Sequence, residues 1–153
     1  MTSVIATYTP IWKPLRYVGV YFLIVAVMVL FTWIMQAVFH IRLPAGLASF
    51  LPPMIAALVE GQCFAMHHGA PPPKGRIWRA VLGMTGVVLI ITLCFLVGLL
   101  FFQTELIPQF KSYSPFLLAF GAVLLFLVSL LNRFFYGLGV KSYLKGKAER
   151  DMQ

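Results

Sequence analysis

Charge is what this sequence has least of. Only 10% of its 153 residues are charged and four are acidic, whereas ordinary soluble domains carry about a quarter charged residues. Hydrophobic residues make up 61% of the chain, and its mean hydropathy is +0.92. The chain therefore lacks the polar surface that would cover a folded domain in water, which excludes a soluble globular domain and indicates an integral membrane protein.

Cysteines and catalytic motifs are also scarce. The two cysteines, Cys63 and Cys94, fall inside apolar runs without a metal-binding spacing around them. Glu60, Cys63 and His67 share one helical face, but this set mixes hard and soft ligands. The sequence contains no G-x-S-x-G, no H-E-x-x-H and no phosphate-binding glycine loop, and its only aspartate is Asp151. We therefore expect no enzymatic activity, no cofactor and no metal site.

Long apolar runs are what the sequence does contain. A bilayer core about 30 Å thick requires roughly 20 apolar residues of helix. Four runs reach that length: residues 15–39, 44–67, 77–102 and 114–140. The sequence predicts an all-α integral membrane protein, in which residues 1–153 form a single bundle of four transmembrane helices. The first run is too long for the core of a cleaved signal peptide, so we expect it to remain as the first helix.

The positive charges separate between the two sides of this predicted bundle. Only Arg42 and Lys111 flank one side. Nine basic residues flank the other side: Lys13, Arg16, Lys74, Arg76, Arg79, Lys141, Lys145, Lys147 and Arg150. The positive-inside rule predicts that the basic side is cytoplasmic, and therefore that both termini are. Since topology accounts for the net charge of +8, we expect no nucleic-acid partner.

The second predicted helix, residues 44–67, has two unusual features. Pro52 and Pro53 remove backbone donors and collide with the preceding turn, which predicts a kink. Small residues then recur on one face of the helix, where they would let another backbone approach closely. This predicted helix-packing face consists of Ala57, Gly61 and Ala65.

One acid, Glu60, also lies within this second helix. Glu60 and Arg133 both fall roughly 10–12 Å from the inner ends of their predicted helices, at a rise of 1.5 Å per residue. A lone charge at this depth costs several kcal/mol, and an ion pair offsets much of that cost. We expect a structural Glu60–Arg133 pair between the second and fourth helices, with Asn132 and Gln62 satisfying the remaining polar groups.

Two other interpretations of these charges stay open. Glu60 and Arg133 could line a cavity for an ion, a proton or a small solute, because ionisable residues inside membranes are often functional. Alternatively, Arg133 extends to the cytoplasmic interface, while Glu60 is neutral or faces a partner protein.

A family resemblance centres on residues 59–83, VEGQCFAMHHGAPPPKGRIWRAVLG. This segment resembles a group of small, functionally uncharacterised bacterial inner-membrane proteins with four predicted spans and the pattern G-Q-x-F…P…W-R. The matching residues are Gly61, Gln62, Phe64, Pro71–Pro73 and Trp78–Arg79. The resemblance implies a multi-pass protein of the bacterial inner membrane, and it implies no activity.

Two functions are compatible with these patterns. The favoured one is a non-enzymatic accessory, scaffold or assembly subunit of a larger respiratory, photosynthetic or transport complex, since polar intramembrane residues are few and small-residue faces suit helix docking. The alternative is a small oligomeric transporter or channel whose polar site contains Glu60 and Arg133. The expected partners are the lipid bilayer and either other membrane subunits or further copies of this chain.

Overall fold

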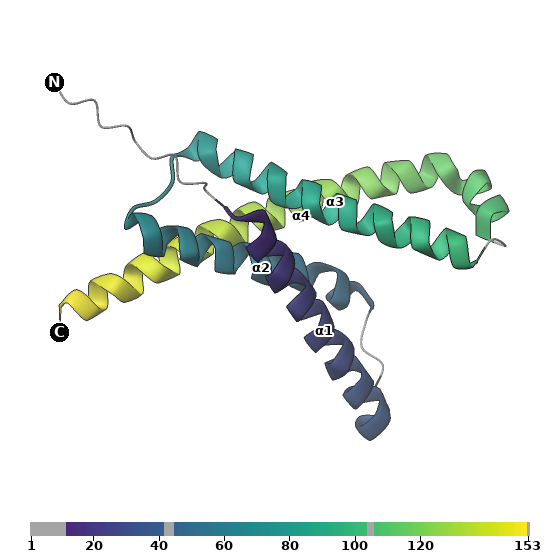
Figure 1. Ribbon diagram of the computed structural model, residues 1–153, viewed down its shortest axis with the longest axis horizontal. Coiled ribbons are helices and arrows are strands. Elements are labelled where there is room, and N and C mark those ends of the chain that lie inside the picture. Colours follow the sequence, from purple (N-terminus) through teal and green to yellow (C-terminus); the bar gives the residue numbers. More distant parts are fainter. Residues whose placement is uncertain (1–11, 42–44, 104–105, 153) are drawn as a thin grey trace.

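The computed structural model describes residues 12–41, 45–103 and 106–152, and these residues form helices and no strands. The helices are α1 (Pro14–Phe39), α2 (Ala45–His68), α3 (Lys74–Phe102) and α4 (Leu106–Asp151), shown in Figure 1. The prediction of an all-α protein is therefore confirmed.

Three of these helices are long and apolar enough to cross a membrane. The qualifying segments are Pro14–Phe39, Gly75–Phe102 and Pro115–Asp151. Among the described residues, α2 is not one of the helices long and apolar enough to cross a membrane. The chain is therefore suited to a membrane, but the expectation of four crossing helices is supported for only three of them.

The fourth helix is much longer than its apolar run. The fourth predicted run covers residues 114–140, but α4 begins at Leu106 and continues to Asp151. Hydropathy detects only the part of a helix that suits hydrocarbon, whereas Lys, Glu and Arg continue a helix well in water. The 37 residues from Pro115 to Asp151 alone correspond to about 56 Å of helix, nearly twice the thickness of a bilayer core.

Local backbone chemistry sets where the helices start and stop. Pro14 occupies the first turn of α1, where its missing N–H costs no hydrogen bond. His40 ends α1 in the left-handed region at φ 54°, and its N–H donates to the Met35 carbonyl. Gly69 takes φ +63° directly after α2. Pro73 is extended (φ −63°, ψ 143°) just before α3.

The helices pack most closely at one junction. The contact between α2 and α4 is the most extensive, followed by those of α1 with α2 and α3 with α4. In Figure 1, α3 and α4 run side by side, while α1 leaves the others at a steep angle. The buried core joins the beginnings of α1 and α3 to the second halves of α2 and α4. The starts of α1 and α3 and the second halves of α2 and α4 therefore lie together in one region of the molecule.

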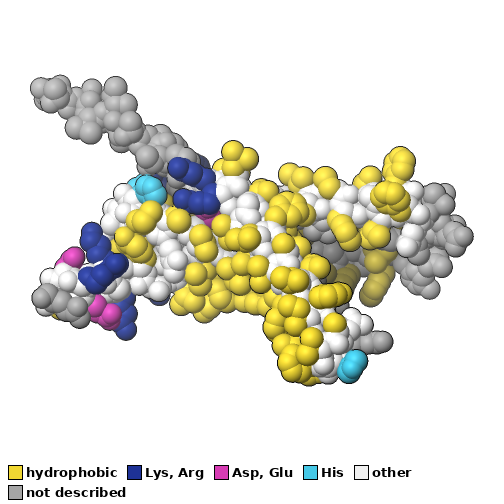
Figure 2. All heavy atoms as spheres, turned by 60° about the horizontal axis from the view of Figure 1, so that its bottom comes forward, with side chains coloured by type: hydrophobic (Ala, Val, Ile, Leu, Met, Phe, Trp, Pro, Cys, Tyr) yellow, Lys and Arg dark blue, Asp and Glu magenta, His cyan; other side chains and the backbone are white. Residues whose placement is uncertain are grey.

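Apolar side chains dominate the surface away from this junction. Toward the end of α3, Phe95, Phe101 and Phe102 are 70%, 83% and 91% exposed. Figure 2 shows hydrophobic side chains over much of one face and Lys and Arg gathered toward the end that holds the C-terminus. A surface with this division suits a lipid core bordered by a charged aqueous layer.

Candidate functional site: a buried ion pair at the helix junction

Glu60 is the charged residue at the centre of the junction. Its side chain is 0% exposed. The Arg16 guanidinium donates from Nε to Oε1 at 2.6 Å and from Nη2 to Oε2 at 2.8 Å. The backbone N–H of Lys13 also donates to Oε2, at 3.2 Å. Both carboxylate oxygens therefore accept hydrogen bonds from one guanidinium. This bidentate geometry is the strongest form of charge-assisted hydrogen bonding.

The predicted partner of Glu60 was wrong. Glu60 pairs with Arg16 of α1, not with Arg133, whose guanidinium instead lies over the Trp78 ring, 4.4 Å from its centroid. Matching depth is necessary for a pair, but facing direction decides it. Neighbouring residues on a helix point about 100° apart, and on α4 it is Asn132 that faces the core, so Arg133 faces outward.

The start of α1 explains why Arg16 can reach Glu60. Lys13 is the N-cap of α1, and its side chain makes no capping hydrogen bond. The carboxylate supplied by α2 accepts the N–H of that residue instead. A negative charge at a helix N-terminus is favourable, because the first backbone N–H groups carry a partial positive charge. Glu60 therefore both neutralises Arg16 and completes the start of α1.

Further polar groups surround the pair. Asn132 of α4 is fully buried, and its Nδ2 donates to the Thr85 hydroxyl of α3 at 3.4 Å. The Tyr17 hydroxyl and Asn132 Oδ1 are buried without a hydrogen-bond partner among the described residues. Gln62, the other expected supporting residue, is half-buried, and no hydrogen bond joins it to Glu60. The junction thus holds polar groups from all four helices.

Two glycines allow α2 and α4 to cross at close range. A Cβ atom at Gly61 would overlap the backbone carbonyl of Tyr136, and one at Gly139 would overlap that of Leu58. The residues of the predicted packing face, Ala57, Gly61 and Ala65, are all buried. Sequence reasoning missed Gly139, because the glycines of the Y-G-L-G segment are two residues apart and do not repeat on one helical face.

A third glycine, Gly83 of α3, lies against Trp12, which precedes α1. A Cβ atom at Gly83 would overlap the Trp12 indole, so this ring packs against the α3 backbone. Trp12 also meets the Tyr17 ring edge-on, with the ring centroids 6.1 Å apart. The two aromatic residues therefore hold the beginning of α1 against α3, and this fixes the place from which Arg16 reaches Glu60.

The two prolines lie on the buried side of α2. Pro52 and Pro53 are both fully buried, and α2 continues through them from Ala45 to His68. They therefore do not end the helix, and the kink stays a prediction.

The two histidines at the end of α2 contact backbone carbonyl groups of the same helix. The Nδ1 atom of His67 lies 2.7 Å from the Cys63 carbonyl oxygen, and that of His68 lies 3.1 Å from the Phe64 carbonyl oxygen. The His68 ring also stacks on Phe64, with centroids 4.1 Å apart. Both rings thus contact carbonyl groups near the helix end. Within the described part of the chain, no three His, Cys, Asp or Glu residues form a group suited to a metal ion.

Comparisons with protein-family models, curated proteins and solved structures find no match for this chain. The resemblance carried by residues 59–83 therefore stays an expectation. What the molecule itself defines is an all-helical protein with three helices suited to a membrane and a neutralised carboxylate where four helices meet.

Proposed function

We propose that this protein is a non-enzymatic accessory or scaffold subunit of a larger membrane protein complex. The proposal rests on a contrast: the four helices pack tightly at one junction, but most of α1 lies away from the other helices (Figure 1). Along α1, Phe22 and Trp33 are 52% and 67% exposed, and α1 diverges from the other helices in Figure 1. Such a helix presents its sides both to lipid and to the helices of a partner.

The state of Glu60 favours this role over transport. A transport site must open to water on at least one side, but the Glu60 side chain is 0% exposed. Its charge is already matched by Arg16, whose side chain is 29% exposed. An ion pair arranged in this way holds α1 against α2 and offers no unpaired charge to a solute.

The proposed location is a bacterial inner membrane, with both termini in the cytoplasm and α2 as the fourth crossing. Two observations support this topology. The starts of α1 and α3 meet the second halves of α2 and α4, as expected for helices that alternate in direction. The basic side chains gather toward the end where the C-terminus lies (Figure 2), which matches the positive-inside rule.

Native purification tests the scaffold role. After extraction in a mild detergent, the tagged protein should migrate as part of a larger assembly, and mass spectrometry should find the same partners at fixed stoichiometry. Trp33→Ala on the divergent α1 should weaken this association. Phe126→Ala, which removes a similarly exposed ring from α4 (63% exposed), serves as the matched control. A chain that migrates alone under these conditions contradicts the proposal.

Water accessibility separates the scaffold from the transporter. In a Cys63→Ser, Cys94→Ser background, Ala57→Cys places a thiol one turn from Glu60 without touching the ion pair. A water-soluble maleimide should leave this thiol unmodified, because Ala57 is 0% exposed, and should modify Lys147→Cys in the exposed end of α4. Equal labelling of both thiols, together with a pure homo-oligomer, would favour transport.

A further inference from the structure

Arg133 is a cation without a carboxylate partner among the described residues. Its side chain is exposed on α4, and its guanidinium lies 4.4 Å from the centroid of the Trp78 ring. The described acids are occupied or distant. Glu60 is engaged by Arg16, while Glu149 lies about 24 Å further along α4. The Trp78 ring stabilises the cation but leaves its net charge uncompensated.

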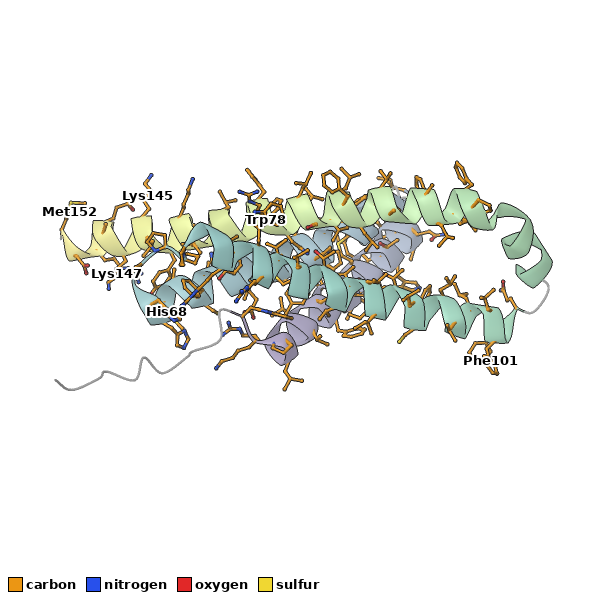
Figure 3. All side chains as sticks on the ribbon, turned by 90° about the horizontal axis from the view of Figure 1, so that it is seen from above. His68, Trp78, Phe101, Lys145, Lys147 and Met152 are labelled. Carbon is orange, nitrogen blue, oxygen red and sulfur yellow. The ribbon has the colours of Figure 1, made fainter. Side chains whose placement is uncertain are left out.

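The position of this pair along the helices matches a layer of lipid phosphates. Trp78 follows the first turn of α3, and tryptophan favours the boundary between hydrocarbon and headgroups. Lys141, the first basic residue of the charged end of α4, lies about 12 Å beyond Arg133. In Figure 3, Trp78 lies beside α4, whereas Phe101 at the other end of α3 points away from it. Arg133 therefore sits at the membrane-facing edge of the basic region.

The geometry is suited to an anion of phosphate type. A guanidinium stacked on an aromatic ring keeps the N–H groups along its edge free, and these can donate in pairs to two phosphate oxygens. Arg79 follows Trp78 directly and is exposed, so a second positive charge lies on the same turn of α3. One helical turn toward the hydrocarbon, Leu82 of α3 and Leu130 of α4 are exposed and offer apolar surface for acyl chains.

We propose that Arg133 and Trp78, with Arg79, form a binding site for the headgroup of an anionic phospholipid. The phosphate contacts the guanidinium edge, and the acyl chains lie along the apolar surface next to Leu82 and Leu130. Basic pockets between helices on the cytoplasmic side are a recurrent way of holding such lipids. The site uses no residue of the Glu60 junction and does not depend on the scaffold role.

Lipid retention by the purified protein tests this site. In native mass spectrometry from detergent micelles, the wild-type protein should retain dioleoylphosphatidylglycerol in preference to dioleoylphosphatidylcholine. Arg133→Gln should weaken retention of the anionic lipid about fivefold, since one basic residue near the surface contributes about 1 kcal/mol. Lys147→Gln removes the same charge from the exposed end of α4 and should change retention little. Equal weakening in both variants would overturn the proposal in favour of general attraction to the basic end.

Two further measurements decide the remaining cases. Inorganic phosphate at millimolar concentration should not displace the lipid, because the acyl chains contribute to binding; displacement would assign the site to free phosphate and overturn the lipid proposal. If Arg133→Gln does not fold, Arg133→Lys and Trp78→Leu serve instead. Arg133→Lys keeps the charge but loses the paired donors, and Trp78→Leu removes the ring, so each should reduce the lipid preference. Unchanged preference in both variants would overturn the site.

Discussion

The junction around Glu60 and the charged end of α4 use the same chemistry in opposite settings. Glu60 and Arg16 meet at 2.6 Å with the carboxylate side chain 0% exposed. Lys145 and Glu149 meet at 3.9 Å with side chains 82% and 58% exposed. In Figure 3, Lys145 and Lys147 leave α4 on opposite sides. The first pair links two helices, whereas the second lies along one turn of a single helix.

The difference shows that surroundings, not residue type, decide what an ion pair contributes. Exposed pairs one helical turn apart contribute about 0.3–0.5 kcal/mol, because water already solvates both charges. Removing one partner of a buried pair costs about 3–5 kcal/mol, and the cost falls toward the lower end of this range when the remaining charge reaches water, as Arg16 does with 29% of its side chain exposed. The junction should therefore be sensitive to changes that the end of α4 tolerates.

The largest effect is expected at Glu60 itself. Glu60→Gln leaves Arg16 without a countercharge and should lower the free energy of unfolding by about 3 kcal/mol. Glu149→Gln is the matched control and should lower it by less than about 0.5 kcal/mol. Reversible unfolding in mixed micelles of detergent and sodium dodecyl sulfate measures both values.

A second variant identifies the partner in the same assay. Arg16→Leu combined with Glu60→Leu removes both charges and should recover part of the stability lost in Glu60→Gln. Arg133→Leu combined with Glu60→Gln should show no such recovery. Recovery with Arg133 in place of Arg16 would refute the pairing described here.

The next largest effect is expected where α2 and α4, the two helices with the most extensive contact, cross closely. Gly61→Ala and Gly139→Ala each place a Cβ against a backbone carbonyl of the other helix, so the free energy of unfolding should fall by about 1–3 kcal/mol. Gly146→Ala, with nothing within 4 Å of its Cβ position, should stabilise by up to about 1 kcal/mol through helix propensity. The same micelle assay compares them, and equal stability of all three would contradict the close crossing.

A smaller effect is expected at Tyr17. Its hydroxyl is buried without a partner among the described residues, and an unpaired buried hydroxyl destabilises a fold. Tyr17→Phe should therefore leave the midpoint of thermal unfolding unchanged or raise it by a few degrees, as measured by size-exclusion chromatography after heating. A marked decrease would show that the hydroxyl is satisfied, either by the neighbouring Asn132 side chain or by a bound water molecule.

The smallest effect is expected at Lys145. Lys145→Gln removes the pair with Glu149 and should change the free energy of unfolding by about 0.3 kcal/mol at low salt. The difference should vanish at about 1 M salt, where charges more than about 3 Å apart are screened. A larger effect that persists in salt would mean that the end of α4 is packed rather than solvated.

The sequence predicted the helices well and the contacts between them poorly. Apolar runs locate α1 and α3 to within three residues, because length and hydropathy are local properties. They could not give the extent of α4, whose polar ends lie outside any apolar run. They also counted α2 as equal to the others, although among the described residues it is not one of the helices long and apolar enough to cross a membrane.

The predicted ion pair failed for a specific reason. The depth of a side chain in the membrane is not enough to predict its partner. Pairing also depends on which helix is adjacent and on which face that helix presents. Arg16 was interpreted only as a flanking charge that sets topology. Yet consecutive antiparallel helices bring the start of one beside the end of the next, and this places Arg16 near Glu60. The order of the runs alone indicates that α1 and α2 are adjacent, but not which faces they present to each other.

The separation of these two residues along the chain has a consequence during synthesis. Arg16 precedes Glu60 by 44 positions, so the guanidinium is synthesised before the carboxylate that neutralises it. The start of α1 can therefore reach its final packing only after that part of α2 has been made and has docked beside it.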